Sequence, residues 1–258
     1  MTFLSVAVEA AKLAGKIQLK YLNKEMHVRT KSTPFDRVTI ADLECEKAVV
    51  QHIKKRYPYH NIIGEEGKYL RTDSPYVWAI DPVDGTNNYS KGYPFFCVSI
   101  GLAFKGKPIV GVVYDAFHRE LFTAQRGKGA RLNSKKVHVS SGKHLGESIL
   151  VTGFYYDRSR IMEETLAQTR KFLKKGILGI RRTGSAALDL AYIAAGRADG
   201  FWELRLNLWD FLAGSLLVEE AGGRVTDRSG KKLDLERTSV VATNGKVHKE
   251  MLRIVNPT

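Results

Sequence analysis

WAIDPVDGTNNYS, residues 78–90, is an apolar run that meets two aspartates separated by a proline and a valine. The apolar residues before Asp81 predict a buried strand. Pro82 fixes one backbone angle, which lets the chain fold both carboxylates around one point together with the Val83 carbonyl. Two carboxylates that close repel each other, and a shared cation removes the repulsion. The segment therefore predicts a cation-binding turn at the end of a strand, built on Asp81 and Asp84.

The second half of the same stretch favours an anion. Gly85 permits a tight turn, and Thr86 can begin a helix or turn whose exposed N–H groups would face a negative charge. Two acids three residues apart usually lie on a solvated helix face, so their spacing alone says little. With a strand before the acids and a glycine-led turn after them, we interpret the segment as a site that holds cations and a phosphate together.

Other carboxylates stand near the ends of predicted elements. Asp42 lies in the first turn of a helix predicted over 42–57, where the helix dipole favours a negative charge. Glu65 and Glu66 follow a short predicted strand. Asp210 lies inside an otherwise apolar helix, where a carboxylate needs a partner. These oxygen ligands, with no histidine or cysteine set at ligand spacing, predict a Mg²⁺ or Mn²⁺ site rather than a zinc site.

Helices and strands interleave along the chain. Apolar runs over 95–125, separated by short turns, predict strands that pair as a meander, and Ser185 is a good N-cap for the helix after it. The mixture favours layered helices and sheets over a purely parallel, doubly wound fold. The polar, Gly/Ser-rich stretch 139–147 is the best candidate for a boundary. We therefore expect an α+β subdomain over 1–143 that carries most of these acids. We expect an α/β subdomain over 144–258 that carries Asp210.

Composition sets the class of protein. The chain of 258 residues is 43% hydrophobic, which is enough for a sizeable core. Its amphipathic start, residues 1–22, lacks a basic leader and is interpreted as a helix that stays in the protein. No stretch is long and apolar enough to span a bilayer. Cys45 and Cys97 lie far apart in regular segments, so no disulfide is expected, and a reducing cytoplasm is the expected location.

The net charge of +14 narrows the partners to two classes, an anionic substrate or a nucleic acid. The cations are spread over the chain, with denser patches at 126–136 and 170–182, and do not form a tail. For most of them a solvated basic surface is the simplest interpretation. The sequence contains no nucleic-acid-binding module that we recognise, so a small anionic substrate is favoured and nucleic acid stays open.

The acidic segments together resemble one family. DPVDGTNNY, residues 81–89, resembles the D-P-[IL]-D-G-T-x-N-[FY] signature of the inositol monophosphatase family. That family consists of Mg²⁺-dependent, lithium-sensitive enzymes that act on small phosphomonoesters. Further segments resemble the family's other motifs in the expected order and cover nearly the whole chain: Asp36–Asp42 with Glu46, Gly64–Glu66, Gly184–Ala187, and Leu208–Gly214 with Glu220–Gly223.

The resemblance implies a role for each matching position. It implies two or three Mg²⁺ ions, with Mn²⁺ as a substitute, on the side chains and one carbonyl of Glu65, Asp81, Val83, Asp84, Asp210 and, through water, Asp42. It implies that Thr86 orients and activates the attacking water, with Glu65, Asp42 and Thr39 in support. It implies that N–H groups of Gly85 and Thr86 hold phosphate oxygens, and that sugar or cyclitol hydroxyls contact Asp84, Gly184, Ser185, Ala186 and Glu203.

The resemblance also implies the fold and the reaction. The expected fold is α+β, a layered αβαβα sandwich, in a homodimer. The leading substrate is myo-inositol 1-phosphate. One alternative is a dual enzyme that also takes fructose 1,6-bisphosphate, for which residues 153–160, with Arg158, carry suitable side chains. Asn87-Asn88-Tyr89 departs from the K-E-F of the branch that cleaves nucleotide bisphosphates. An alternative of another class is a regulator that binds RNA or the transcription machinery, which the basic charge motivates.

Overall fold

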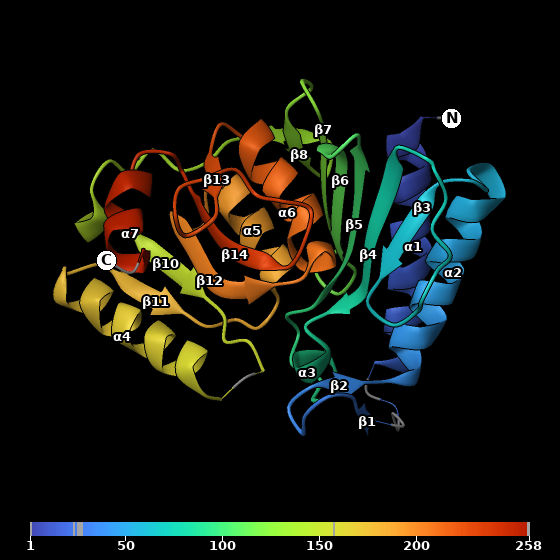
Figure 1. Cartoon of the computed structure of the whole chain (residues 1–258), viewed down its shortest axis with the longest axis horizontal. Coiled ribbons are helices and arrows are strands. Elements are labelled where there is room, and N and C mark those ends of the chain that lie inside the picture. The colour runs from blue at the N-terminus through green and yellow to red at the C-terminus, as the bar shows by residue number, and fades with distance from the viewer. Residues whose placement is uncertain (1, 23, 25–27, 157, 257–258) are drawn as a thin grey trace.

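The computed structural model describes residues 2–22, 24, 28–156 and 158–256, and its elements stack in five layers (Figure 1). Helices α1 (Phe3–Tyr21) and α2 (Ile40–Arg56), drawn in blue, cover one face of a seven-stranded sheet. Helices α5 (Ala186–Ala194) and α6 (Leu208–Glu220) lie between this sheet and a five-stranded one. Helices α4 (Arg160–Lys174) and α7 (His248–Val255) cover the outer face of the second sheet. The predicted αβαβα sandwich is confirmed.

The seven-stranded sheet contains the predicted meander. Its strands follow the chain in spatial order, and all neighbours are antiparallel except the parallel first pair. The strands are β3 (Asn61–Gly64), β4 (Tyr76–Asp84), β5 (Cys97–Phe104), β6 (Lys107–Asp115), β7 (Glu120–Gln125), β8 (Ala130–Leu132) and β9 (Lys135–Val137). Because β3 and β4 are parallel, Glu65 directly after β3 and the two acids at the end of β4 lie at the same end of the sheet.

The second sheet is mixed, in the order β11, β10, β12, β14, β13. Its strands are β10 (Ile149–Thr152), β11 (Gly179–Arg181), β12 (Gly200–Leu206), β13 (Arg224–Thr226) and β14 (Thr238–Thr243). Three smaller elements complete the described chain: a hairpin of β1 (Arg29–Thr30) and β2 (Arg37–Val38), the short helix α3 (Thr86–Tyr89), and the 3₁₀ helix η1 (Leu145–Glu147). The hairpin and α3 lie together at one end of the molecule (Figure 1).

The central helix layer is held by apolar contacts on both of its sides. α6 is buried on almost every face, with Phe211, Leu212, Leu216 and Leu217 within 1% of full burial, so it is stable only between two apolar surfaces. One buried cluster joins it to both sheets, for example to Phe201. The chain passes from one sheet to the other between residues 137 and 149, but the two halves share this core. The division at 143 stays a prediction.

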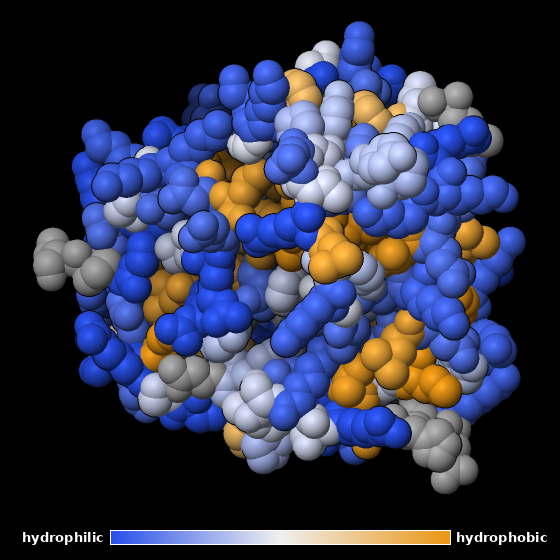
Figure 2. Space-filling view, turned by 45° about the vertical axis from the view of Figure 1, so that its right-hand side comes forward, coloured by the Kyte–Doolittle hydropathy of each residue, from blue (hydrophilic) through white to orange (hydrophobic). Residues whose placement is uncertain are grey.

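The surface agrees with the buried core. Figure 2 shows hydrophilic side chains over most of one face, with hydrophobic ones in recesses and small patches. In the described part of the chain, no helix is long and apolar enough to cross a membrane.

Candidate active site

A cavity lies where the carboxyl-terminal ends of β3 and β4 face the first turns of α5 and α6. Six acids from five separate elements or loops line it: Glu65, Asp81, Asp84, Asp189, Glu203 and Asp210. The predicted substrate-loop residues line the same cavity, as do the residues of the turn after β4: Val83, Gly85, Thr86, Gly184, Ser185 and Ala186. The structure therefore brings together residues that lie more than a hundred positions apart in the sequence.

Strand β4 does not end at Asp81 as predicted. It continues to Asp84, and its register against β5 shifts between these two residues. Such a bulge bends the strand and re-aims its side chains, which explains how Pro82 is tolerated there. The Val83 N–H donates to Asp81 Oδ1 at 3.0 Å, and the Gln18 side chain of α1 donates to the Pro82 carbonyl at 2.9 Å. The turn that carries both aspartates is thus fixed from inside and from behind.

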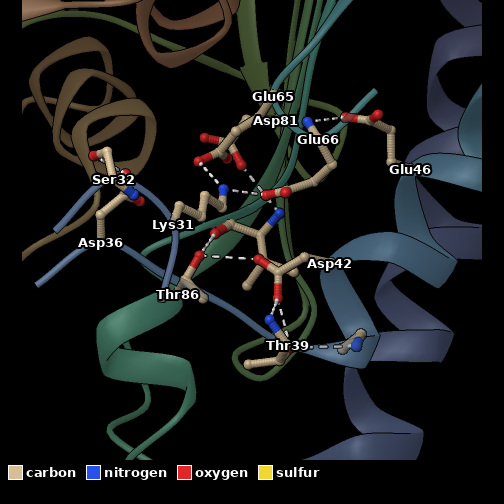
Figure 3. Close-up of polar contacts among 12 residues, drawn as sticks. Lys31, Ser32, Asp36, Thr39, Asp42, Glu46, Glu65, Glu66, Asp81 and Thr86 are labelled. Atoms are coloured by element: carbon tan, nitrogen blue, oxygen red, sulfur yellow. Dashed lines mark hydrogen bonds and ion pairs between the residues drawn. The ribbon is translucent and has the colours of Figure 1, made fainter. Parts of the chain in front are cut away.

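Gly85 has the left-handed φ of 98° and precedes α3. A Cβ at this position would lie 2.9 Å from the Phe95 carbonyl oxygen, so only glycine fits. The Thr86 hydroxyl lies 2.9 Å from Asp42 Oδ1 (Figure 3). It also lies 3.0 Å from the Val83 carbonyl oxygen. The turn after β4 is therefore connected directly to helix α2 through one hydroxyl group.

Asp42 is where the sequence predicts it, in the first turn of α2. The other oxygen of its carboxylate accepts the Thr39 N–H at 2.8 Å and the Thr39 hydroxyl, which closes a capping box (Figure 3). Burial raises the pKa of Asp42 to about 6, although the bonds from Thr39 and Thr86 oppose this shift. Thr39, Asp42 and Thr86 thus form one hydrogen-bonded chain behind the cavity.

Asp210 lies inside a helix, as the sequence predicts. It is the third residue of α6, and its Oδ2 accepts the Asn207 N–H at 2.7 Å. Asn207 is the N-cap of α6, and asparagine is one of the residues that N-cap positions prefer. Burial, followed by the charges of Asp84 and Glu65, raises the pKa of Asp210. The helix start therefore fixes this acid at the edge of the cavity.

Asp84 connects the turn after β4 to the substrate loop. Its Oδ2 accepts the Ser185 hydroxyl at 2.7 Å and the Ala187 N–H at 2.6 Å, at the start of α5. Ser185 is the N-cap of α5, as predicted. Burial raises the pKa of Asp84 to about 6 against these hydrogen bonds. The loop that is expected to hold substrate is therefore fixed by one of the expected metal ligands.

Burial makes this group of acids unstable as anions. It raises the pKa of Asp81, with further contributions from the charges of Glu65, Asp84 and Asp210. It raises the pKa of Glu203 to about 8, although Arg182 opposes the shift. A bound cation would stabilise the charged form of these acids, which burial otherwise disfavours. The chemistry of the donor set therefore fits Mg²⁺, which prefers carboxylate and carbonyl oxygen.

The oxygen atoms are not already arranged as a closed metal cluster. Among the residues that the structure describes, no group of three or more His, Cys, Asp or Glu side chains stands at the spacing of a metal site. One carboxylate oxygen each of Asp84 and Asp210 is engaged by the protein, and both oxygens of Asp42 are. Binding a cation at the cavity would use the remaining oxygens of Asp84 and Asp210, and would reach Asp42 through water.

Two residues at or beside the cavity, Lys31 and Asp189, are not among those predicted from the sequence. Lys31, next to the β1–β2 hairpin, contacts Glu65 at 2.9 Å and also Glu66 (Figure 3). Burial lowers the pKa of Lys31, but the two carboxylates outweigh burial and raise it. Asp189 is buried and accepts the Thr183 hydroxyl. An acid in an apolar helix was a usable signal for Asp189, as it was for Asp210, whereas nothing local marks Lys31.

The comparisons with known proteins agree with this architecture. The sequence matches the family model described as the inositol monophosphatase family over residues 1–256. The chain therefore belongs to the inositol monophosphatase family. An "Inositol-1-monophosphatase" from Synechocystis sp. is 43% identical over 251 residues, which cover 97% of this chain and 87% of that protein. A "Nus factor SuhB" from Pasteurella multocida is 42% identical over 257 residues, which cover 98% of this chain and 96% of that protein.

Solved structures share the fold over almost the whole chain. The inositol monophosphatase of Anabaena (Nostoc) sp. superposes with a TM-score of 0.88 at 44% identity, covering 98% of this chain and 94% of that one. An "IMPase/NADP phosphatase complexed with Mg2+ and phosphate" superposes with a TM-score of 0.86 at 25% identity, covering 98% and 95%. Membership of this family, which is generally Mg²⁺-dependent, supports a phosphatase that acts on small phosphomonoesters.

Proposed function

We propose that the protein hydrolyses myo-inositol 1-phosphate to myo-inositol and phosphate in a Mg²⁺-dependent reaction. The observation that carries the proposal is the meeting of Glu65, Asp81, Asp84 and Asp210 in one buried cavity beside the Thr86–Asp42 pair. Family membership supports the class of reaction. The basic net charge of +14 suits an anionic substrate.

The acids of the cavity would hold two or three Mg²⁺ ions, for which Mn²⁺ could substitute. The assigned ligands are Glu65, Asp81, the Val83 carbonyl, Asp84 and Asp210, with Asp42 acting through water. Bound divalent cations supply positive charge that stabilises the phosphate and the leaving oxygen and makes water more acidic. They also remove the repulsion among carboxylates whose pKa values burial raises. The Mg²⁺ that the family implies is therefore also the kind of ion that would stabilise the buried acids of this chain.

Thr86 would orient the attacking water. A hydroxyl has one proton to donate and two lone pairs to accept with. When Thr86 donates to Asp42, both lone pairs are free to accept a hydrogen bond from water. Asp42 is held by Thr39, so the acceptor cannot turn away. Glu65, which lines the same cavity, would help to hold this water.

The substrate would lie against the start of α5. The N–H groups of Gly85 and Thr86 would donate to phosphate oxygens, because the left-handed Gly85 turns the chain there. The hydroxyl groups of the cyclitol would contact Asp84, Gly184, Ser185, Ala186 and Glu203, all of which line the cavity. We also propose, on family membership, that the protein is a lithium-sensitive cytoplasmic homodimer.

The test is a panel of phosphate-release assays with Mg²⁺. We expect inositol 1-phosphate to be turned over and adenosine bisphosphate to be a poor substrate. Turnover of adenosine bisphosphate alone would overturn the choice of substrate. Absence of phosphate release from every phosphomonoester of the panel would overturn the proposed reaction.

A second candidate is a dual enzyme that also takes fructose 1,6-bisphosphate, which an arginine-lined groove favours. The acidic cavity has a volume of about 90 Å³, and a groove of about 430 Å³ adjoins it through Tyr155 and Tyr156. Arg158 packs over the Phe35 ring at 4.9 Å in this groove. No ion pair in the described part of the chain involves Arg158, so its charge is available to a second phosphate.

A matched pair of substrates separates the two candidates. Fructose 1,6-bisphosphate and fructose 1-phosphate differ only in the second phosphate. If the groove binds that phosphate, the bisphosphate has the higher kcat/KM, and Arg158→Gln lowers this preference about tenfold or more. Arg253→Gln, on α7, is the matched control. Equal kcat/KM for both substrates in the wild type would remove the dual candidate.

A candidate of another class is a regulator that binds RNA or the transcription machinery. Its support is the net charge of +14 and the name "Nus factor SuhB" of similar bacterial proteins. Binding through phosphate contacts weakens steeply as salt rises. We expect a salt-dependent affinity for RNA if this role exists beside catalysis. No detectable RNA binding at low salt would end it.

A further inference from the structure

Glu46 of α2 is a buried carboxylate whose two oxygens are both used, and the proposed reaction gives it no role. It lies one helical turn after Asp42 and is 2% exposed. Its Oε2 accepts the Glu66 N–H at 3.0 Å, and its Oε1 accepts the Tyr69 hydroxyl at 2.7 Å. Both partners lie in the loop that follows β3. Glu46 therefore binds the loop that carries Glu65 from the helix behind it.

The backbone of that loop wraps closely around the Glu46 carboxylate. A Cβ on Gly64 would lie 2.6 Å from Glu46 Oε2, and a Cβ on Gly67 would lie 2.7 Å from Oε1. Real Cβ atoms do not come this close to an oxygen, so glycine at both positions is what lets the loop close on the carboxylate. The segment from Gly64 to Gly67 is thus shaped around one side chain of α2.

The loop is held on its other side by the sheet. The Glu65 N–H donates to the Ile80 carbonyl of β4 at 3.2 Å. The Glu65 side chain lines the acidic cavity, whereas Glu66 faces Lys31 and offers its backbone N–H to Glu46 (Figure 3). Two consecutive N–H groups are therefore bound to two different elements, and the direction of Glu65 follows from both bonds.

We propose that Glu46 is a positioning residue that holds the 64–67 loop so that Glu65 points into the cavity. The inference rests on the proposed function in one respect, that Glu65 is taken as a metal ligand. A carboxylate that accepts a backbone N–H makes a strong, directional bond, and groups behind a metal ligand commonly change metal affinity by about 10- to 100-fold. Glu46 acts through geometry and does not touch the ion.

Three variants separate geometry from charge. Glu46→Gln keeps an oxygen for the Glu66 N–H, and its amide N–H can donate to the Tyr69 oxygen, so it preserves the bonds without the charge. Glu46→Leu removes both bonds at similar size. Tyr69→Phe removes one. Val49→Ala, on the same buried face of α2, is the matched control, because it weakens packing without touching the 64–67 loop.

The measurements are Mg²⁺ titration calorimetry and amide hydrogen exchange at Glu66. We expect Glu46→Leu to weaken Mg²⁺ binding by about tenfold or more and to expose the Glu66 amide, with Tyr69→Phe between it and the wild type. Glu46→Gln and Val49→Ala should keep wild-type values in both measurements, even where Val49→Ala lowers the melting temperature. Gly67→Ala replaces Glu46→Leu if the leucine variant does not fold, with the same expectation.

Two results would overturn the inference. One is a Glu46→Gln protein that loses as much Mg²⁺ affinity as Glu46→Leu, because the charge of Glu46 would then matter and not its bonds. The other is unchanged protection of the Glu66 amide in Glu46→Leu. If the wild type binds no Mg²⁺ at all, the proposed function fails, and the amide exchange still decides whether Glu46 holds the loop.

Discussion

Removal of the Thr86 hydroxyl tests how the site prepares its nucleophile. Thr86→Val keeps the shape of the side chain and deletes only the group that lies between Asp42 Oδ1 and the Val83 carbonyl. The hydroxyl can donate one proton, so in the proposed reaction it donates to Asp42 and accepts from water. Valine can do neither. The change therefore leaves Asp42 with one bond fewer and the attacking water without its acceptor.

The size of the effect follows from the bond that is lost. A hydrogen bond to a charged partner contributes about 1.5–3 kcal/mol. If that energy is realised in the transition state, kcat falls by about 10- to 160-fold, since each 1.36 kcal/mol is a factor of about ten. The Thr39 bonds to Asp42 remain, so the fold around the turn should survive.

The assay is steady-state phosphate release at saturating Mg²⁺, with Thr86→Ser as the control. Serine keeps the hydroxyl and loses only a methyl group, so we expect it to stay within about threefold of the wild type. The reasoning is refuted if Thr86→Val also stays in that range. It is equally refuted if the serine variant is as slow as the valine variant.

Three further predictions concern stability and inhibition. Burial, with the charge of Arg224, lowers the pKa of His248 from 6.5 to about 4. Between these two pH values the folded state therefore binds fewer protons than the unfolded chain. The free energy of unfolding should therefore fall from pH 7 to pH 5, by at most about 2 kcal/mol through this ring, and urea titrations of His248→Asn should lack that part of the slope. Gly85→Ala should lower the free energy of unfolding by about 1–3 kcal/mol, because its φ is left-handed and the Phe95 carbonyl leaves no room for a Cβ; an unchanged urea midpoint would contradict this. Lithium should inhibit phosphate release, and a fully insensitive enzyme would weaken the family analogy.

Local signals in the sequence located much of the site. Asp42 was found as a first-turn acid and Ser185 as an N-cap, because capping depends on residues within one turn. Asp81 and Asp84 were found because an apolar run meets polar residues there. Each of these features depends only on residues that are neighbours in the sequence. They therefore survive when nothing is known about tertiary contacts.

One local prediction, the end of strand β4, was wrong for a physical reason. The strand rule stops at proline, yet a bulge lets β4 pass Pro82 and continue to Asp84. Strand β5 pairs with β4 on both sides of this bulge, and no local pattern in the sequence reveals that pairing. Asp210 was correctly placed in a helix, and the local signal that was not used is Asn207, a favourable N-cap directly before that helix.

Contacts between segments that lie far apart in the chain could not be predicted from local sequence patterns. Lys31 meets Glu65 across 34 residues, and its position depends on how the β1–β2 hairpin folds back over the site. Glu46 was noted only as the last position of a family motif, whereas its contacts with the 64–67 loop depend on two glycines and a tyrosine that lie around it. Pairs of this kind are set by the packing of α2 against the sheet, which no local pattern encodes.

The central claim is that the buried acids hold the cations that drive phosphate release. Its most direct test is phosphate release from inositol 1-phosphate as Mg²⁺ is varied, in the wild type, Asp81→Asn and Asp210→Asn. We predict that wild-type turnover rises to saturation with Mg²⁺, stops in excess chelator, and is mostly lost in both variants at saturating Mg²⁺. Turnover that persists in chelator, or wild-type kcat in either variant, would contradict the claim.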